Sequence, residues 1–229
     1  EIDEDEADSS LTIDMSIYAG QSEDAAVIRV RDGFGPSRGN YVASLSQRLV
    51  FRTALDLAPG SYLAVYRILD RTSGQAAQAR ETFTVPDRFS DGFNLSTIVL
   101  ARQLSPIDLD NERPDAFTLG RFRVVPNIDA TYRNGEDLAF YYQLSGADLD
   151  PRTGHPRLDV RYHFAAQQGD DWLDLGEALV YRDLEDPHGW SVPLIDWPPA
   201  SYRLTVRITD KISGTTRSQD AYFRVVPGS

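Results

Sequence analysis

The sequence predicts an all-β protein made of two tandem immunoglobulin-like antiparallel β-sandwich modules. Three observations carry this prediction: an internal repeat, a period-two alternation of apolar and polar residues, and no stretch with a convincing helical period. Glycine and proline also recur too often for long helices. The 229 residues and the 41% hydrophobic content suffice for two modules of ordinary size, each with its own core.

The repeat joins residues 55–85 to residues 195–225, which align without a gap at an offset of 140. Chance would hardly place so many identities, including the same turn residues, in one register. The identical pairs include Asp56/Asp196, Pro59/Pro199, Ser61/Ser201, Tyr62/Tyr202, Arg67/Arg207, Ile68/Ile208, Asp70/Asp210, Ser73/Ser213, Gly74/Gly214, Phe83/Phe223 and Val85/Val225.

Each copy of the repeat predicts a β-hairpin. A Pro-Gly or Pro-Ala turn precedes an alternating strand, in which Tyr202 and Leu204 share one face and Arg203 the other. Turn-forming residues from Asp70 to Gly74, and from Asp210 to Gly214, end the strand. Because two strands alone are barely stable in water, each hairpin must belong to a larger sheet.

Further short strands complete the two modules, with turns every 8–14 residues. In the first module we predict strands at 11–18, 25–31, 41–44 and 49–55. In the second module we predict strands at 121–126, 137–144, 158–164, 172–181 and 189–194.

The predicted boundaries follow from these elements. Residues 1–10 form an acidic, mobile end, residues 11–104 the first module, 105–116 a linker, and 117–229 the second module. The apolar segment 93–102 is interpreted as a sheet-edge strand of the first module.

Composition excludes several classes of protein. The net charge of −12 argues against nucleic acid and anionic membranes as partners. The absence of cysteine excludes disulfides and thiol chemistry, and no apolar run is long enough to span a membrane. Lys211 is the only lysine, a bias that fits either a GC-rich genome or adaptation to high salt. Because the chain starts at Glu1, we expect a mature or excised fragment.

The sequence predicts no catalytic residue and no cofactor. It contains neither a GxSxG elbow nor a phosphate-binding GxxxxGK[ST] loop. Its three histidines, His155, His163 and His188, show no spacing typical of metal ligands and are interpreted as surface or edge residues. We therefore predict that the chain is not an enzyme.

Two weaker binding hypotheses remain open. Calcium could be bound by Asp108 and Asp110, or by Asp148 and Asp150, because each pair places carboxylates at alternate loop positions. A glycan could stack on Trp172, Trp190 and Trp197, which all belong to the second module and are the interaction candidates. Trp197 aligns with Leu57, however, which favours a packing role for this one.

The hairpin motifs carry a resemblance to a known family. Residues 57–74, 83–85 and 95–101 resemble the β-sandwich portions of exported bacterial GWxTD-domain proteins and related tandem immunoglobulin-like envelope proteins. The second copy matches through 197–214, with Ala200 where the family has glycine. The Gly-Trp-x-Thr-Asp element itself is missing, since Ser-Val-Pro follows Gly189-Trp190. The resemblance implies a location in the bacterial cell envelope.

We therefore predict a non-enzymatic structural or protein-interaction module, located in the periplasm or outside the cell. Sheet edges could pair with a protein partner or with a second copy in a fibre-like assembly, with 11–18 or 95–101 as exchanged or interface strands. The alternatives are a module that binds glycan or calcium, and an accessory domain of a larger exported enzyme.

Overall fold

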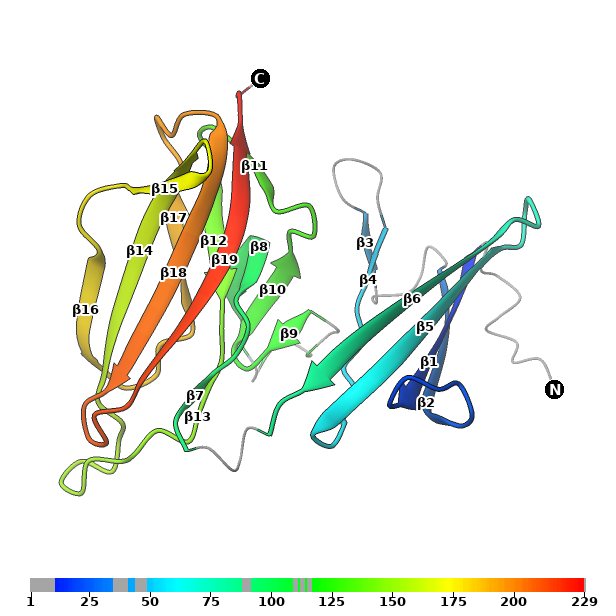
Figure 1. Ribbon diagram of the computed structural model, residues 1–229, viewed down its shortest axis with the longest axis horizontal. Coiled ribbons are helices and arrows are strands. Elements are labelled where there is room, and N and C mark those ends of the chain that lie inside the picture. Colours follow the sequence, from blue (N-terminus) through cyan, green and yellow to red (C-terminus); the bar gives the residue numbers. More distant parts are fainter. Residues whose placement is uncertain are drawn as a thin grey trace. The chain divides into compact units, whose positions relative to one another are not determined.

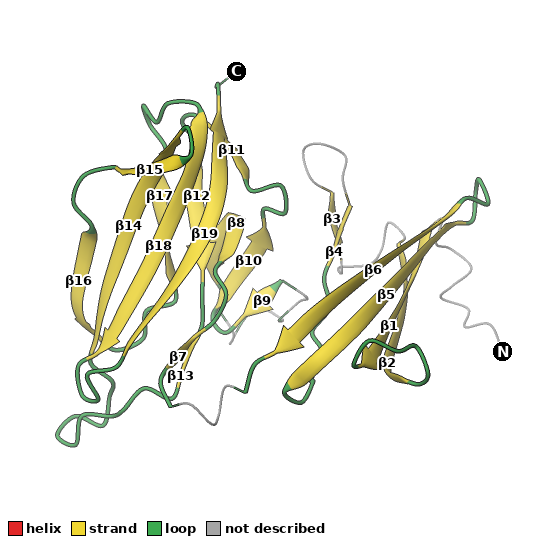
Figure 2. Ribbon diagram, viewed as in Figure 1, coloured by secondary structure: helices red, strands yellow, loops and turns green. Residues whose placement is uncertain are grey.

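The computed structural model describes residues 11–34, 41–43, 49–87, 92–108, 111, 114 and 117–228. All regular elements within these ranges are strands, which confirms the all-β prediction (Figures 1 and 2). None of the described residues forms a helix long and apolar enough to cross a membrane. The predicted acidic end, residues 1–10, lies outside the described residues. The chain divides into a first unit, Glu1–Asp87, and a second unit, Arg88–Ser229.

The first unit contains a four-stranded antiparallel sheet in the order β2-β1-β5-β6. Its strands are β1 (Leu11–Ala19), β2 (Ala26–Phe34), β5 (Gly60–Asp70) and β6 (Ala76–Val85), and β3 (Tyr41–Ala43) pairs separately with β4 (Leu49–Phe51). Met15, Ile17, Tyr62 and Ala64 are buried together, because cross-strand partners such as Ile17 and Ala64 share a face. The central strand β1 pairs with β2 on one side and β5 on the other, so the predicted interface strand 11–18 presents no open edge in this sheet.

The second unit consists of two sheets packed as layers, visible in Figure 1 as β14, β18 and β19 in front of β12 and β17. The five-stranded sheet has the order β17-β12-β8-β10-β9. Its strands are β8 (Val99–Pro106), β9 (Thr118–Leu119), β10 (Phe122–Pro126), β12 (Asp137–Tyr141) and β17 (Gly189–Pro193).

The six-stranded sheet has the order β11-β19-β18-β14-β15, and β16 also pairs with β14. Its strands are β11 (Thr131–Arg133), β14 (Leu158–Gln168), β15 (Asp171–Asp174), β16 (Leu179–Leu184), β18 (Ala200–Asp210) and β19 (Thr216–Val226). A separate short pair joins β7 (Asn94–Leu95) to β13 (Leu144–Ser145).

The main core lies between these two sheets. Leu138 and Phe140 of β12 face Val160, Tyr162 and the alternate apolar residues of β18, and all of them are buried. The alternation of β18 continues along its length, from Tyr202 through Leu204 and Val206 to Ile208. This is the burial pattern that period-two alternation predicts for a sheet with one face in the core.

The two copies of the repeat form hairpins with the same register, as the alignment predicts. Tyr62 pairs with Phe83 in the first, and Tyr202 pairs with Phe223 in the second. Both tyrosine hydroxyl groups donate a hydrogen bond to the carbonyl oxygen four residues earlier, at Ala58 (2.7 Å) and at Pro198 (2.5 Å).

The division between the units lies earlier than predicted. Segment 93–102 does not form an edge of the first unit, because β7 pairs with β13 and β8 lies between β12 and β10. Part of the predicted linker is also regular structure, since β8 extends to Pro106. With a partner on each side, β8 presents no open edge. The predicted strand 172–181 is interrupted as well, and becomes β15 and β16.

Candidate functional site

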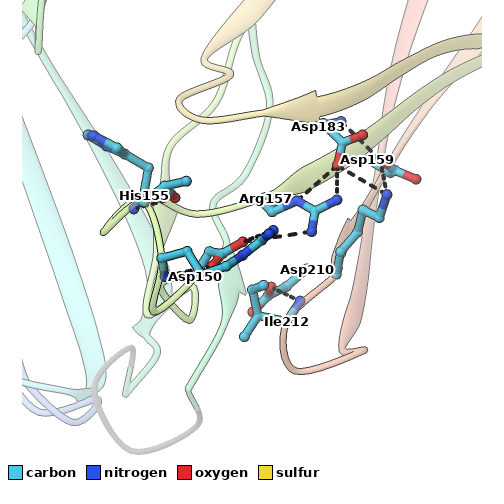
Figure 3. Close-up of polar contacts among 10 residues, drawn as sticks. Asp150, His155, Arg157, Asp159, Asp183, Asp210 and Ile212 are labelled. Atoms are coloured by element: carbon cyan, nitrogen blue, oxygen red, sulfur yellow. Dashed lines mark hydrogen bonds and ion pairs between the residues drawn. The ribbon is translucent and has the colours of Figure 1, made fainter.

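The carboxylate of Asp150, a predicted calcium ligand, forms ion pairs with Arg152 and Arg157. Its Oδ1 accepts a hydrogen bond from the Arg152 amide at 2.9 Å, and its Oδ2 lies 3.7 Å from the Arg157 guanidinium (Figure 3). The amide hydrogen bond, helped by both guanidinium groups, holds the pKa of Asp150 below its usual value despite the burial of this carboxylate. The Asp150 carboxylate therefore interacts with two cationic side chains of the same chain.

A second carboxylate, that of Asp183, interacts with Arg157 and with Lys211, so Arg157 links Asp150 and Asp183 in one polar network. Its Oδ1 accepts hydrogen bonds from Arg157 (2.8 Å from Nη2) and from Lys211 (3.1 Å from Nζ) (Figure 3). The hydrogen bond from Arg157 has the largest effect in lowering the pKa of Asp183, and the hydrogen bond from Lys211 has the next largest. Asp183 also has a φ of +53°, an uncommon backbone conformation for aspartate. The network ties β16 to β14 and to the turn after β18.

The other calcium candidates do not converge with Asp150 on a metal site. The amide of Asp148 donates to Asp210, and the carboxylate of Asp108 accepts a hydrogen bond from Asn111 at 2.6 Å. Asp110 lies outside the described residues. No group of three or more histidine or acidic side chains that could hold a metal ion occurs in the described part of the chain.

The three tryptophans lie in different environments. Trp197 packs into the core, with its ring 4.9 Å from that of Tyr202 and 5.3 Å from that of Phe164. Leu57, its counterpart in the repeat, packs against the core cluster of the first unit. Trp197 is therefore a packing residue, and only Trp172 and Trp190 remain as surface candidates.

Trp172 lies on the outer face of the six-stranded sheet. Its ring centroid is 5.6 Å from that of Tyr222, and the Arg203 guanidinium carbon is 5.2 Å from the Trp172 centroid. Tyr222 is 56% exposed, whereas Ala165 on the same face is fully buried. Tyr222 and Ala165 are cross-strand partners of Arg203, so all three side chains lie on the same face of the sheet. Trp172, Tyr222 and Arg203 together form an aromatic and cationic patch on that face.

The histidines are spread over the second unit, and each lies beside one acid. The pairs are His155–Glu185, His163–Asp174 and His188–Asp186. His188 also lines a hollow of about 440 Å³, together with Pro106, Ile107, Asp108, Arg121, Phe122 and Asp186. Its ring packs against Phe122 and Tyr141, with centroid distances of 5.7 Å and 6.0 Å. His188 directly precedes Gly189, the first residue of β17, so the hollow lies beside this end of the strand.

An open sheet edge is the most distinctive feature of the second unit. β17 pairs with β12 on one side only, within the residues that the structure describes. The hydrogen bonds from Tyr142 to His188 and from Leu194 to Glu136 set the phase of this ladder. In an antiparallel pair, hydrogen-bonded and non-hydrogen-bonded positions alternate, so the backbones of Trp190 and Val192 face β12. The N–H and C=O groups of Gly189 and Ser191 consequently point to the open edge.

Exposed apolar side chains lie on β15, on β16 and in the connection between them, beside β14 of the six-stranded sheet. Leu173 pairs with Ala166, and Leu179 pairs with Tyr162, so both leucines project toward the core side of their sheet. They are nevertheless 57% and 41% exposed, and Leu175 is 43% exposed. Trp190 of β17 reaches Tyr181 of β16 (5.0 Å between ring centroids) and is itself 45% exposed.

We call this group the apolar strip: Leu173, Leu175, Leu179, Tyr181 and Trp190. Its leucines and Tyr181 lie beside β14, and Trp190 of β17 contacts Tyr181. Sequence reasoning assigned 172–181 to one continuous strand and missed the strip. Gly176, inside that stretch, was the signal of an interruption, because a glycine within a strand pattern marks a break.

Comparisons with known proteins add little to this description. No family model matches the chain, and no curated protein matches it. Among solved structures, the chain is similar to the three N-terminal domains of the highly immunogenic outer capsid protein (Hoc) of bacteriophage RB49. That match has 12% sequence identity and a TM-score of 0.24, and it covers 94% of this chain and 56% of the phage chain. The resemblance to GWxTD-domain proteins gains no support from these comparisons.

Proposed function

We propose that the chain is a non-enzymatic, extracytoplasmic protein-interaction module that binds another polypeptide through the open edge of its second unit. The observation that carries the proposal is the combination of unpaired backbone groups on β17 with the apolar strip beside them. An extended segment added to a sheet edge gains main-chain hydrogen bonds from the edge and side-chain contacts from the surface beneath it. The edge of β17 offers both.

The proposal includes two tandem copies of an immunoglobulin-like sandwich module. Its support is the matching hairpin register of the two units and the matching tyrosine hydrogen bonds to Ala58 and Pro198. A tyrosine that bonds back to the backbone at this corner is a hallmark of such sandwiches. The extracytoplasmic location rests on the family resemblance alone. Fractionation of cells that express the complete gene tests it, and recovery only in the cytosol would contradict it.

The interaction itself is tested by selecting random peptides displayed on phage against the whole chain. Ser191→Pro removes the N–H that points to the open edge and leaves the hydrogen bonds to β12 in place, whereas Ser191→Ala retains that N–H. We expect enriched peptides to bind the unmodified chain and the alanine variant equally, and the proline variant at least about tenfold more weakly. Circular dichroism checks that both variants are folded.

A second variant tests the apolar strip. Leu179→Ser removes one exposed apolar side chain of the strip, and Ile128→Ser is a matched control, because Ile128 is 59% exposed and lies in a loop outside it. The same peptides should bind Leu179→Ser more weakly and Ile128→Ser normally. Enrichment of no peptide, or of peptides indifferent to both Ser191→Pro and Leu179→Ser, would overturn the proposed function.

Glycan binding is the second candidate, because one specific patch favours it. Tyr222 is exposed and lies against Trp172 and Arg203, which gives a surface on which a sugar ring can stack. Calorimetry with a panel of glycans tests it. Heat that is lost in Tyr222→Ala and kept in Leu179→Ser would support it, and the absence of heat across the panel would end it.

A further inference from the structure

We infer that the partner of the β17 edge is a basic extended segment, with apolar residues at alternate positions and lysine or arginine between them. This inference rests on the proposed function, and it specifies the chemistry of the ligand. Two features carry it: the faces that the edge presents to an added strand, and the charge of the chain around that edge.

The faces determine the alternation. Residues of an added strand that lie opposite Trp190 and Val192 project toward the core side, where Leu173, Leu175 and Leu179 are exposed. Residues opposite Gly189 and Ser191 project to the other side, toward solvent. The partner therefore presents apolar side chains at every second position, and polar or charged side chains at the positions between.

The charge determines which polar residues these are. Segment 169–196 forms β15, β16, β17 and their connections, and contains eight acidic residues but one arginine. Glu185 and Asp186, which lie in the connection between β16 and β17, have side chains that are 64% and 76% exposed. An acidic strand would meet like charges here, while a basic strand would be attracted and correctly oriented. The acidity of the segment also disfavours a second copy of the same edge as the occupant.

The hollow beside His188 extends this chemistry at the Gly189 end of the edge. Asp108 and Asp186 line it together with the aromatic ring of Phe122, and Arg121 also faces it.

The experiment uses two synthetic peptides of about ten residues that share valine at alternate positions and carry either lysine or glutamate at the others. Binding to the whole chain, to Ser191→Pro and to Ser191→Ala is measured by fluorescence anisotropy, with dye-labelled peptides. We expect the lysine peptide to bind at least about tenfold more tightly than the glutamate peptide. Raising NaCl from about 50 mM to about 500 mM should weaken its binding, because exposed charges are screened.

The outcomes separate this inference from the proposed function. Equal binding of both peptides, abolished by Ser191→Pro, would overturn the basic partner and leave the edge as the binding site. Preference for the glutamate peptide, or no binding of either peptide, would also overturn the basic partner. In that case the selection of phage-displayed peptides still tests whether the β17 edge is a binding site. Tight binding of the lysine peptide that Ser191→Pro does not weaken would be electrostatic attraction elsewhere on the acidic surface, and would overturn the inference.

Discussion

Asp210 accepts a hydrogen bond from the amide of Asp148, 3.0 Å from its Oδ2, whereas its counterpart Asp70 binds the amides and the hydroxyl of its own turn. Both aspartates close the same type of turn after the first strand of the hairpin. Asp210 additionally bonds to Ile212 and Ser213, and is fully buried. One repeated residue therefore has a purely local role in the first unit and connects distant segments in the second.

Removing the Asp210 carboxylate should destabilise the second unit. Asp210→Ala removes the fully buried carboxylate that accepts hydrogen bonds from the amides of Asp148 and Ile212, so we expect the free energy of unfolding to fall by at least about 1 kcal/mol. Urea unfolding followed by tryptophan fluorescence measures it, because all three tryptophans lie in the second unit. Asp70→Ala is the matched control and should leave this transition unchanged. Equal shifts in the two variants would contradict the prediction.

The same carboxylate should make stability depend on acid pH. Burial alone would raise the pKa of Asp210, but the hydrogen bonds from Asp148, Ile212 and Ser213 outweigh burial and hold the pKa below its usual value. Below about pH 5 the unfolded chain therefore binds more protons than the folded chain, and stability is lost as the pH falls through the folded value. Urea unfolding at a series of pH values should show this loss. It should be smaller in Asp210→Asn, and identical pH profiles would exclude the assignment.

The hydroxyl groups of Tyr142 and Tyr162, 2.8 Å apart in the core, should show energetic coupling. Burial raises the pKa of both tyrosines, that of Tyr162 to about 12. Tyr142→Phe leaves the Tyr162 hydroxyl without a partner and should cost about 1–3 kcal/mol. The double variant should cost less than the sum of the single variants, by at least about 0.5 kcal/mol. A double-mutant cycle from urea unfolding measures this, and strict additivity would refute it.

Gly189 should tolerate no side chain. It has a φ of +148°, and a Cβ atom there would collide with the carbonyl oxygen of Phe140 on the neighbouring strand. We expect Gly189→Ala to lower the free energy of unfolding by at least about 2 kcal/mol. Gly154→Ala is the control for backbone strain alone, since Gly154 has a φ of +73° and open space around it, and should cost about 1 kcal/mol. Similar thermal shifts in both variants would show that the collision is relieved.

Much of the secondary structure could be predicted from the sequence, because the signals were local. Alternation within 158–164 and the turn residues after Asp210 depend on neighbouring positions only. The placement of 93–102 could not be predicted in this way. An apolar strand alternates in the same manner whichever sheet it joins, so only the long-range pairing of β8 with β12 and β10 assigns it to the second unit.

The candidate site was mostly hidden from the sequence. Trp190 was recognised as an interaction candidate by its residue type, but Leu173, Leu175 and Leu179 read as ordinary strand residues. Asp150 had the spacing of a calcium ligand, yet two arginines close in sequence take up its carboxylate. The exposure of the three leucines depends on which strands come together in space, and spacing along the sequence does not contain that information.

The sequence by itself determined the duplicated hairpin, including its register, its closing turns and the tyrosines bonded to Ala58 and Pro198, because all these interactions join residues close in the chain. Only the tertiary structure decided how each copy is used. Ile68 and Ile208 are identical in the repeat, but Ile68 is 42% exposed and Ile208 is fully buried. The physical reason is that burial comes from the opposing sheet, whose strands lie far away in the sequence, and the same long-range packing leaves β17 as an open edge.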